Sequence, residues 1–360
     1  MKILITSAGS LVGQNILDAL EGRRDGVFII GSNSTAEAAN LFRCDLALLA
    51  PPAADAAAWC QFTAELIANE GVDLVLPARD DDVRLLARLR DRHPQLRRVI
   101  ACGSETVAAI LEDKGRSRDF ALTHQLPFAA SARGAAEIEA LLAEAGFPLI
   151  AKPLAGNGSR GVRVIRDAQE LTQALAWPDY LFQEYLGPDR DQFDGTDLRR
   201  AGVPLFHAPP YVHLAAQALI SPGGTVEAVF CGEITMVMGR AERSVALDAP
   251  DFAAIARSYA EAFAAAGWVG LINIQGRRNA KGQFKAYEFN GRVAGASATR
   301  LYLDFDEIAM LAEHFAGHTL APHPRGGASN RIVHKSLSDY LIEAEELATL
   351  AREGRWRKSP

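Results

Sequence analysis

The chain has 360 residues, of which 49% are hydrophobic and 23% are charged, and its formal net charge is −6. This size and composition predict a globular protein with two or three domains. A net negative charge argues against nucleic acid as a partner, because a phosphate backbone attracts basic surfaces. No apolar run reaches the roughly 18 residues that a transmembrane helix needs, so no membrane partner is expected.

Two features of the sequence indicate a cytoplasmic location. The N-terminal MKILITSAG enters a strand pattern directly, without the cationic and apolar segments of a leader peptide. The cysteines lack CxxC spacing and neighbouring histidines, which disfavours both zinc and a disulfide framework. We expect them to be small buried side chains in a reducing compartment. They are Cys44, Cys60, Cys102 and Cys231.

Short apolar runs alternate with helical patterns over residues 1–112. The runs KILIT, FIIGSN, VDLVLP and RRVIACG are typical of strands, and residues 14–21, 56–70 and 81–90 are typical of helices. Such alternation predicts a parallel, doubly wound, Rossmann-like sheet.

The turn after the first strand carries Gly9 and Gly13 but not the full GxGxxG pattern of dinucleotide-binding proteins. The second strand ends at Asn33, where an acid that binds ribose would be expected. We therefore interpret the glycines as packing residues of the turn. An oxidoreductase built on this sheet remains the alternative.

A charged group follows the strand VDLVLP, at a sheet edge where ligands commonly bind. Arg79 is a candidate ligand contact, and Asp80–Asp82 fit the start of the next helix, whose N-terminus favours acids.

The most informative central segment is a strand that bears a lysine and leads into a glycine-rich loop. Lys152 lies in GFPLIAKPL, and a buried lysine without a partner is costly. The loop is flexible enough to fold over phosphates and offer them backbone N–H groups. The alternative is a hairpin with a long glycine turn. The loop residues of interest are Gly156, Gly158, Ser159 and Gly161.

A predicted hairpin, LINIQ followed by FKAYEFN, brings together a second group of polar residues. Side chains alternate along a strand, so Glu288 and Asn290 share a face, and Gln275 joins them if the strands pair. A carboxylate and two amide oxygens, with Arg292 just beyond, form a hard-oxygen site suited to Mg²⁺. The alternative is an ordinary hairpin with a solvated polar face.

Two other regions have less pattern. Residues 188–211 are polar and rich in proline, which predicts a long loop or lid. Its aspartates, at 189, 191, 194 and 197, do not have the spacing of a calcium loop. Toward the C-terminus we expect a helix over residues 336–352, followed by a solvated basic end.

Five motifs and their order along the chain resemble those of the ATP-grasp superfamily, specifically its carbamoyl-phosphate-synthase-like branch. The motifs are EDKGRSRDF, FPLIAKPLAGNGSRGV, FQEYLG, INIQ and YEFNGR. The resemblance implies an α/β fold with a Rossmann-like parallel sheet followed by a two-subdomain (α+β) ATP-grasp fold. It implies domain boundaries of 1–112, 113–186, 187–325 with an insertion at 188–212, and a tail at 326–360.

The same resemblance implies roles for the nucleotide-binding residues. Lys114 and Lys152 would hold ATP phosphates beneath the glycine-rich loop named above. Glu184 would bind the ribose, with Gln183 and Tyr185 beside the adenine.

The resemblance also implies a metal site and a reaction. Gln275, Glu288 and Asn290 would bridge two Mg²⁺ ions to ATP, with Mn²⁺ as a substitute, and Arg292 would stabilise the transferring phosphoryl group. Family enzymes convert a carboxylate to an acylphosphate, which an amine attacks. Such phosphoryl transfer depends on positioning and charge neutralisation rather than on a protein nucleophile. One departure is Gly291, which replaces a proline of the family motif and leaves the placement of Arg292 in question.

The sequence therefore predicts a stand-alone ATP- and Mg²⁺-dependent ligase that joins a small carboxylate to an amine. Its partners are small molecules, with a homodimer left open. Arg240, Arg243 and Arg300 are candidates to hold a substrate carboxylate, since a guanidinium binds it in a fork. A grasp module that binds ATP without turnover is a further alternative.

Overall fold

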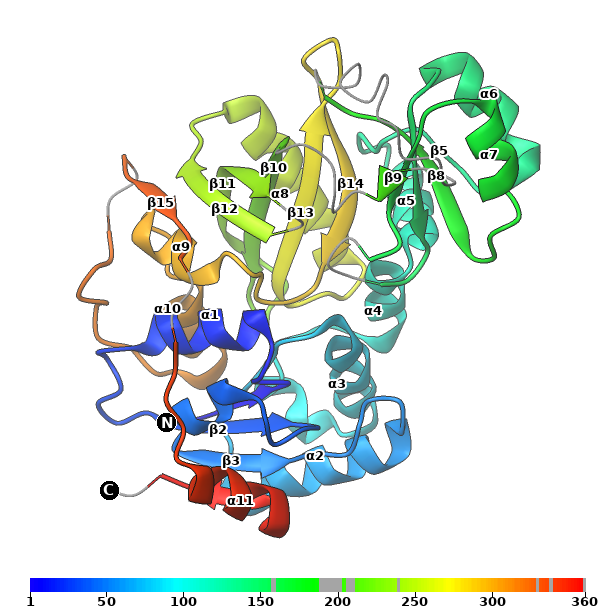
Figure 1. Ribbon diagram of the computed structural model, residues 1–360. Coiled ribbons are helices and arrows are strands. Elements are labelled where there is room, and N and C mark those ends of the chain that lie inside the picture. The colour runs from blue at the N-terminus through cyan, green and yellow to red at the C-terminus, as the bar shows by residue number, and fades with distance from the viewer. Residues whose placement is uncertain are drawn as a thin grey trace.

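The computed structural model describes residues 1–156, 160–187, 203–204, 211–237, 240–327, 330–336 and 339–358. Within them the chain forms three sheets, each covered by helices (Figure 1). No helix of these ranges is long and apolar enough to cross a membrane. The α/β fold class predicted from the sequence is confirmed.

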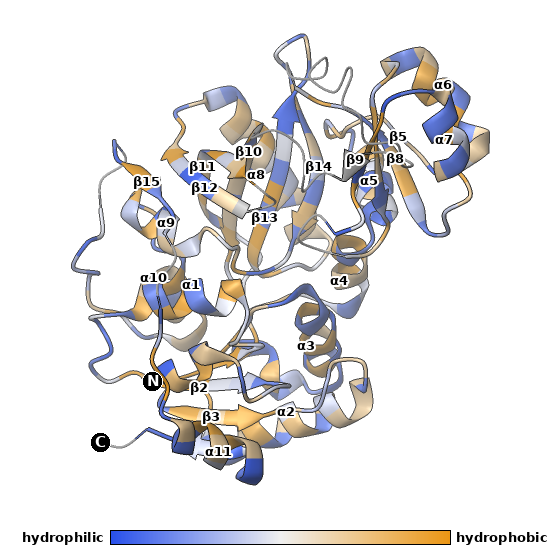
Figure 2. Ribbon diagram, in the orientation of Figure 1, coloured by the Kyte–Doolittle hydropathy of each residue, from blue (hydrophilic) through white to orange (hydrophobic). Residues whose placement is uncertain are grey.

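The first sheet is the predicted Rossmann-like one. Its strand order is β16-β3-β2-β1-β4, and β1 to β4 are parallel. Strand β3 is hydrophobic along its length (Figure 2), as expected where helices cover both faces. The strands are β1 (Lys2–Thr6), β2 (Phe28–Asn33), β3 (Leu46–Leu49), β4 (Leu74–Pro77) and β16 (Arg355–Arg357). The helices of this region are α1 (Leu11–Leu20), η1 (Ala39–Arg43), α2 (Ala56–Glu70), α3 (Asp80–Arg92), η2 (Pro94–Arg98) and α4 (Glu105–Glu112).

The C-terminal segment differs from its prediction. The expected helix is shorter, α11 (Ala344–Glu353). The basic residues at the end are exposed as expected, but they belong to an unpredicted strand, β16, antiparallel to β3. The alternation of Arg355, Trp356 and Arg357 explains this pairing, because it buries Trp356 and leaves the arginines exposed. The Trp356 ring packs against Phe42 at 5.1 Å between centroids.

The second sheet belongs to a small subdomain with its own core. Its strand order is β5-β8-β6-β7-β9, and α6 contacts it. Its strands are β5 (Ser131–Ala132), β6 (Leu149–Pro153), β7 (Arg163–Ile165), β8 (Tyr180–Glu184) and β9 (Val203–Pro204). Its helices are α6 (Ala135–Ala145) and α7 (Ala168–Ala174), whereas α5 (Lys114–Thr123) contacts α4 and β14.

The third sheet is antiparallel, in the order β14-β13-β10-β11-β12-β15, and α8 packs on β10 and β11. Its strands are β10 (Tyr211–Ile220), β11 (Val226–Val237), β12 (Arg240–Ala246), β13 (Gly270–Arg278), β14 (Phe284–Asn290) and β15 (Ile332–His334). The accompanying helices are α8 (Pro250–Ala265), α9 (Ser297–Tyr302) and α10 (Glu307–Ala316).

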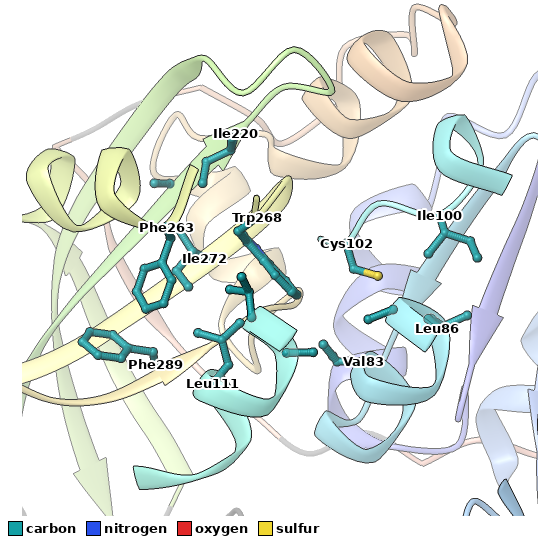
Figure 3. Close-up of a cluster of buried hydrophobic side chains, with 14 of the residues drawn as sticks. Val83, Leu86, Ile100, Cys102, Leu111, Ile220, Phe263, Trp268, Ile272 and Phe289 are labelled. Carbon is teal, nitrogen blue, oxygen red and sulfur yellow. The ribbon is translucent and has the colours of Figure 1, made fainter. Parts of the chain in front are cut away.

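One hydrophobic core joins the first and third sheets. Figure 3 shows Trp268 beside Leu111 of α4 and Ile272 of β13, with Val83 and Leu86 of α3 on its other side. These side chains are buried. The shared core fixes the carboxyl edge of the Rossmann-like sheet against the hairpin β13–β14.

Candidate active site

The predicted hairpin is present, and its register brings the polar residues together. Gln275 of β13 lies opposite Glu288 of β14, and Asn273 lies opposite Asn290. Directly opposed residues in antiparallel strands project from the same face, so all four share one face of the sheet.

Tyr287 forms a bulge in this hairpin. Gln275 pairs with Glu288, but Gly276 pairs with Ala286, so Tyr287 is the extra residue of β14. Its carbonyl accepts a hydrogen bond from Lys152 Nζ at 2.8 Å. The bulge thereby connects the predicted metal-binding strand to the predicted phosphate-binding lysine.

A chain of amide hydrogen bonds orients Gln275. Its Nε2 donates to Asn273 Oδ1 at 2.8 Å, and Asn273 Nδ2 donates to Gln217 Oε1 at 2.9 Å. This leaves Gln275 Oε1 available beside Glu288 and Asn290, and such a donor set fits Mg²⁺. Asn273 is part of the motif INIQ, but the sequence alone assigned it no role.

Lys152 is buried on β6 and is bonded on two sides. Besides the Tyr287 carbonyl, its Nζ donates to Gln183 Oε1 at 2.8 Å. Burial lowers its pKa to about 7, although the nearby Glu288 carboxylate acts in the opposite direction. Removing an ammonium from water favours the neutral amine, so an anionic phosphate would restore its charge.

Lys114 reaches the glycine-rich loop from the start of α5. Helices α4 and α5 are separated at Asp113, whose side chain caps α5 by accepting from Gly115 N and Arg116 N. Lys114 Nζ donates to the Gly156 carbonyl at 2.9 Å. The helix start therefore directs Lys114 toward the same space as Lys152.

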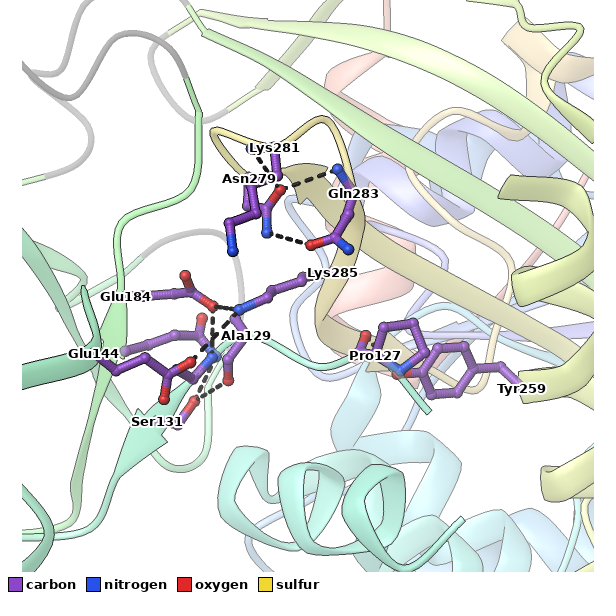
Figure 4. A network of polar contacts seen from close by, with 12 residues as sticks. Pro127, Ala129, Ser131, Glu144, Glu184, Tyr259, Asn279, Lys281, Gln283 and Lys285 are labelled. Atoms are coloured by element: carbon purple, nitrogen blue, oxygen red, sulfur yellow. Dashed lines mark hydrogen bonds and ion pairs between the residues drawn. The ribbon is translucent and has the colours of Figure 1, made fainter. Parts of the chain in front are cut away.

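The end of β8 is held by surrounding polar groups. Gln183 Nε2 donates to Ser131 Oγ at 2.9 Å, and Glu184 Oε1 accepts from the Ala130 amide at 2.7 Å. Glu184 also pairs with Lys285, which lies 4.0 Å from Glu144 Oε1 (Figure 4). No sequence pattern indicated a role for Lys285.

Tyr185, the next residue along, is buried beneath the guanidinium of Arg277. The Arg277 Cζ lies 5.5 Å from the centre of the Tyr185 ring. The two side chains thus form a cation–π pair at the predicted adenine position.

Arg292 is fixed by an acid from the Rossmann-like domain. Its Nε lies 2.7 Å from Asp80 Oδ1, and its Nη2 donates to Asp80 Oδ2 at 2.8 Å and to Asn290 Oδ1 at 3.2 Å. Asp80 was predicted only as a first-turn acid of α3. A Cβ added at Gly291 would lie 2.3 Å from Trp268 Cζ2, so glycine there permits close packing.

These residues surround one cavity of about 830 Å³. It lies between the Rossmann-like sheet, the small subdomain and the site face of the third sheet. The predicted residues that line it are Lys114, Lys152, Gly156, Gln183, Glu184, Tyr185, Gln275, Glu288, Asn290, Arg292 and Arg300.

Other loop residues are placed differently or not described. The Gly161 carbonyl accepts from the Tyr180 hydroxyl at 3.0 Å, and Gly161 is not among the described residues that line the cavity. Gly158, Ser159 and the considered aspartates at 189, 191, 194 and 197 lie outside the described residues.

The candidate substrate arginines do not lie together. Arg300 lines the cavity, and its Nε and Nη2 bind the buried carboxylate of Glu307 at 3.0 and 2.9 Å. Arg243 pairs with Thr235, which points away from the site face, and its Nη1 lies 3.8 Å from Glu233 Oε1. The prediction that Arg243 reaches the substrate site is therefore not supported. The side chain of Arg240 lies outside the described residues.

His213 of β10 is a cavity residue that the sequence did not indicate. Its Nδ1 lies 3.0 Å from the Tyr287 hydroxyl, and burial lowers its pKa to about 4. It is therefore neutral at pH 7. A single histidine on an apolar strand has no motif around it, so only the fold reveals its position.

The Rossmann-like domain supplies the other wall of the cavity. Arg79, Ser10 and Asn33 line it, as the position of Arg79 beyond β4 suggested. Asp82 accepts hydrogen bonds from Thr6 Oγ1 at 2.7 Å and Ser7 Oγ at 3.0 Å, and burial raises its pKa to about 6.

No family model matches the chain. A protein described as "Uncharacterized protein y4rH", from Sinorhizobium fredii (strain NBRC 101917 / NGR234), is 27% identical over 197 residues. The match spans 51% of this chain and only 36% of that relative.

Solved structures are similar over most of the chain. An ADP complex of purK, N5-carboxyaminoimidazole ribonucleotide synthetase, has a TM-score of 0.65 and 16% identity, over 98% of this chain and 84% of that one. Biotin carboxylase from Campylobacter jejuni has a TM-score of 0.63 and 16% identity, over 91% of this chain and 73% of that one. L-amino acid ligase from Bacillus licheniformis has a TM-score of 0.60 and 15% identity, over 86% of this chain and 73% of that one. The chain has the ATP-grasp fold, as its resemblance to the ATP-grasp superfamily predicted.

Proposed function

We propose that the chain is an ATP- and Mg²⁺-dependent ligase that activates a carboxylate as an acylphosphate and couples it to an amine. The observation that carries the proposal is the convergence of Lys114, Lys152, Glu288 and Asn290 on one cavity. Two cations opposite a carboxylate and an amide oxygen suit a polyphosphate bound with a divalent cation. Assignment to the carbamoyl-phosphate-synthase-like branch stays a prediction.

The nucleotide would lie between the small subdomain and the hairpin. Lys114 and Lys152 would meet its phosphates, and the Glu184 carboxylate at the end of β8 would accept from its ribose hydroxyls. Burial lowers the pKa of Lys152, and a bound phosphate would favour its charged form.

The metal would be held by Gln275, Glu288 and Asn290, whose oxygens share one face of the hairpin. When bound, Mg²⁺ neutralises phosphate charge during phosphoryl transfer. The Asn273 amide keeps Gln275 oriented for this role. Two ions, and replacement by Mn²⁺, are part of the proposal.

The reaction would proceed in two steps. A substrate carboxylate oxygen attacks the γ-phosphorus of ATP, the bond to the bridging oxygen breaks, and ADP leaves. An amine then attacks the acyl carbon, the carbon–oxygen bond to phosphate breaks, and the nitrogen loses a proton to solvent. Arg292, held by Asp80, would stabilise charge on the transferring phosphoryl group.

The proposal is tested by incubating the full chain with Mg²⁺-ATP, pooled carboxylates and hydroxylamine, which traps an acylphosphate as a hydroxamate. We expect ADP and hydroxamate to appear together and only when a carboxylate is present. MgADP binding without ADP production in any mixture would instead indicate a non-catalytic module. NADPH binding without nucleotide-dependent protection against heating would favour the oxidoreductase.

A further inference from the structure

The site face of the third sheet changes from polar to apolar across its strands. At the β14 and β13 end it carries Glu288, Gln275 and Asn290. Crossing the sheet, the register places Ala215 of β10 beside Gln275 and pairs Met236 of β11 with Ala241 of β12. The metal-binding half thus continues into a half that is apolar apart from His213, which lies opposite Ile234.

We define the apolar half by the small cluster of side chains that forms it and lines the cavity. Three of its five members are alanines, which leave volume rather than fill it. They are Ala215, Ile234, Met236, Ala241 and Ala296. A cavity of about 830 Å³ is near the upper end of the roughly 300–1,000 Å³ typical of ligand sites, which leaves room beside a nucleotide.

The Rossmann-like domain contributes a second apolar surface beside the apolar half. Leu11 at the start of α1 is 49% exposed, although leucine is usually buried. A Cβ added at Gly295 would lie 3.7 Å from Leu11 Cδ2, so Leu11 faces the segment between β14 and α9. Leu11 and Val12 both line the cavity, which gives the apolar half a second apolar surface.

A cationic group borders this apolar half. Arg300 lines the cavity, and Glu307 occupies its Nε and Nη2. Within the described residues its Nη1 makes no hydrogen bond, so that nitrogen can meet a carboxylate oxygen. Arg292 also lines the cavity, and its Nη2 donates to Asn290 Oδ1 of the metal-binding half. A site with an arginine on one side and apolar side chains on the other suits an amphipathic molecule, one that carries both a carboxylate and an apolar group.

We propose that the acceptor of the phosphoryl group is a small carboxylate with an apolar side group. The carboxylate lies at Arg292 and Arg300, and the side group packs between Leu11 and the apolar half. This inference rests on the proposed ligase function and specifies its substrate class. Removing apolar surface from water is favourable, so such a site favours this substrate over a polar one of equal size.

The test compares carboxylates that match in shape and differ in polarity. L-leucine and L-asparagine are one pair, and 4-methylpentanoate and succinamate are the same pair without an α-amino group. ADP and hydroxamate formation are measured with Mg²⁺-ATP and hydroxylamine. We expect kcat/KM for the apolar member of at least one pair to be about tenfold higher or more, a usual difference for an apolar pocket.

A matched pair of variants locates the specificity. Ile234→Ala enlarges the apolar half and is expected to shift preference from leucine toward phenylalanine by about tenfold. Thr235→Ala changes the neighbouring residue on the other face of β11 and is expected to leave the preference unchanged. A KM effect confined to the Ile234 variant distinguishes specificity from a general loss of stability.

The binding readout separates failure of this inference from failure of the ligase proposal. Calorimetry first measures the binding of MgADP to the full chain. It then measures the binding of each carboxylate in the presence of Mg²⁺ and a non-hydrolysable ATP analogue. If the polar member of each pair binds or reacts as well as the apolar one, or no carboxylate binds, the substrate class is wrong. Absence of MgADP binding would overturn the ligase proposal itself.

Discussion

The guanidinium of Arg292 is paired with the carboxylate of Asp80, although the two residues are 212 positions apart. The Nε–Oδ1 distance is 2.7 Å, and the side chains are only 12% and 23% exposed. Asp80 begins α3 of the Rossmann-like domain, whereas Arg292 follows the metal-binding hairpin. The placement of a proposed catalytic arginine therefore depends on a second domain.

Replacing Asp80 by asparagine should lower kcat while leaving MgADP affinity unchanged. Asparagine keeps one hydrogen bond but loses the charge that orients Arg292, and misplacement by about 1 Å can cost on the order of 100-fold in rate. Steady-state kinetics and calorimetry with MgADP check this. Asp81→Asn, at an exposed neighbouring position, serves as the control, and equal kcat losses in both variants would contradict a specific role for Asp80.

Changing Glu288 to glutamine should abolish turnover with the fold intact. The substitution removes the single charged oxygen ligand among Gln275, Glu288 and Asn290, and loss of comparable charge stabilisation costs roughly 100- to 1,000-fold or more in kcat. The dependence of ADP binding on Mg²⁺ should disappear in calorimetry. Wild-type activity in this variant would refute the metal assignment.

Binding of nucleotide should take up a proton above pH 7. The pKa of Lys152 is lowered to about 7, so above that pH its amine is neutral and must gain a proton to meet a phosphate. Calorimetry of a MgATP analogue at pH 8.5 in buffers of different ionisation heats measures the uptake. Lys152→Met should bind more weakly and show no uptake, and identical heats in wild type would rule out this assignment.

The same shift predicts the pH dependence of stability in the absence of nucleotide. Between pH 7 and the ordinary lysine value of about 10.4, the unfolded chain holds a proton on Lys152 that the folded chain lacks. This contribution makes the free energy of unfolding rise with pH across that window. Urea unfolding should show the rise in wild type and a smaller one in Lys152→Met.

Adding a methyl group at Gly291 should destabilise the protein by about 1–3 kcal/mol, the usual cost of overpacking. The new Cβ would lie 2.3 Å from Trp268 Cζ2 and 2.7 Å from Leu111 Cδ1. Urea unfolding measures the change. At Gly223 the added Cβ meets nothing closer than 4.0 Å, so Gly223→Ala is the control, and equal stability of the two variants would contradict the packing argument.

Much of the fold could be predicted because it depends on local patterns. Alternating apolar runs predicted β1, β2 and β4 but missed β3, and the run RRVIACG, also expected to be a strand, makes only an isolated bridge between Ile100 and Val75. The polar turn between LINIQ and FKAYEFN predicted the hairpin β13–β14. The C-terminal strand β16 could not be predicted, because a run as short as Arg355–Arg357 becomes a strand only when β3 offers it an edge.

The site divides in the same way. Lys152, Gln275 and Glu288 stood out because a lysine on an apolar strand and alternating polar residues on a hairpin are visible along the chain. No such pattern marked His213, Lys285 or the role of Asp80, because each of these residues acts on a residue far away in sequence. For Arg243 the sequence pointed to the site but the fold does not place it there. A register shift in β12 decides which face of the sheet its side chain takes, and a single strand does not reveal such a shift.

The sequence by itself determined which residues carry charge, which strands alternate and which loop is rich in glycine, because these follow from local sterics and hydrophobic periodicity. Only the tertiary structure decided that Asp80 holds Arg292, that glycine at position 291 packs against Trp268, and that the metal-binding face continues into an apolar half. Those relationships arise when the shared core brings separate elements together, and no local pattern encodes them.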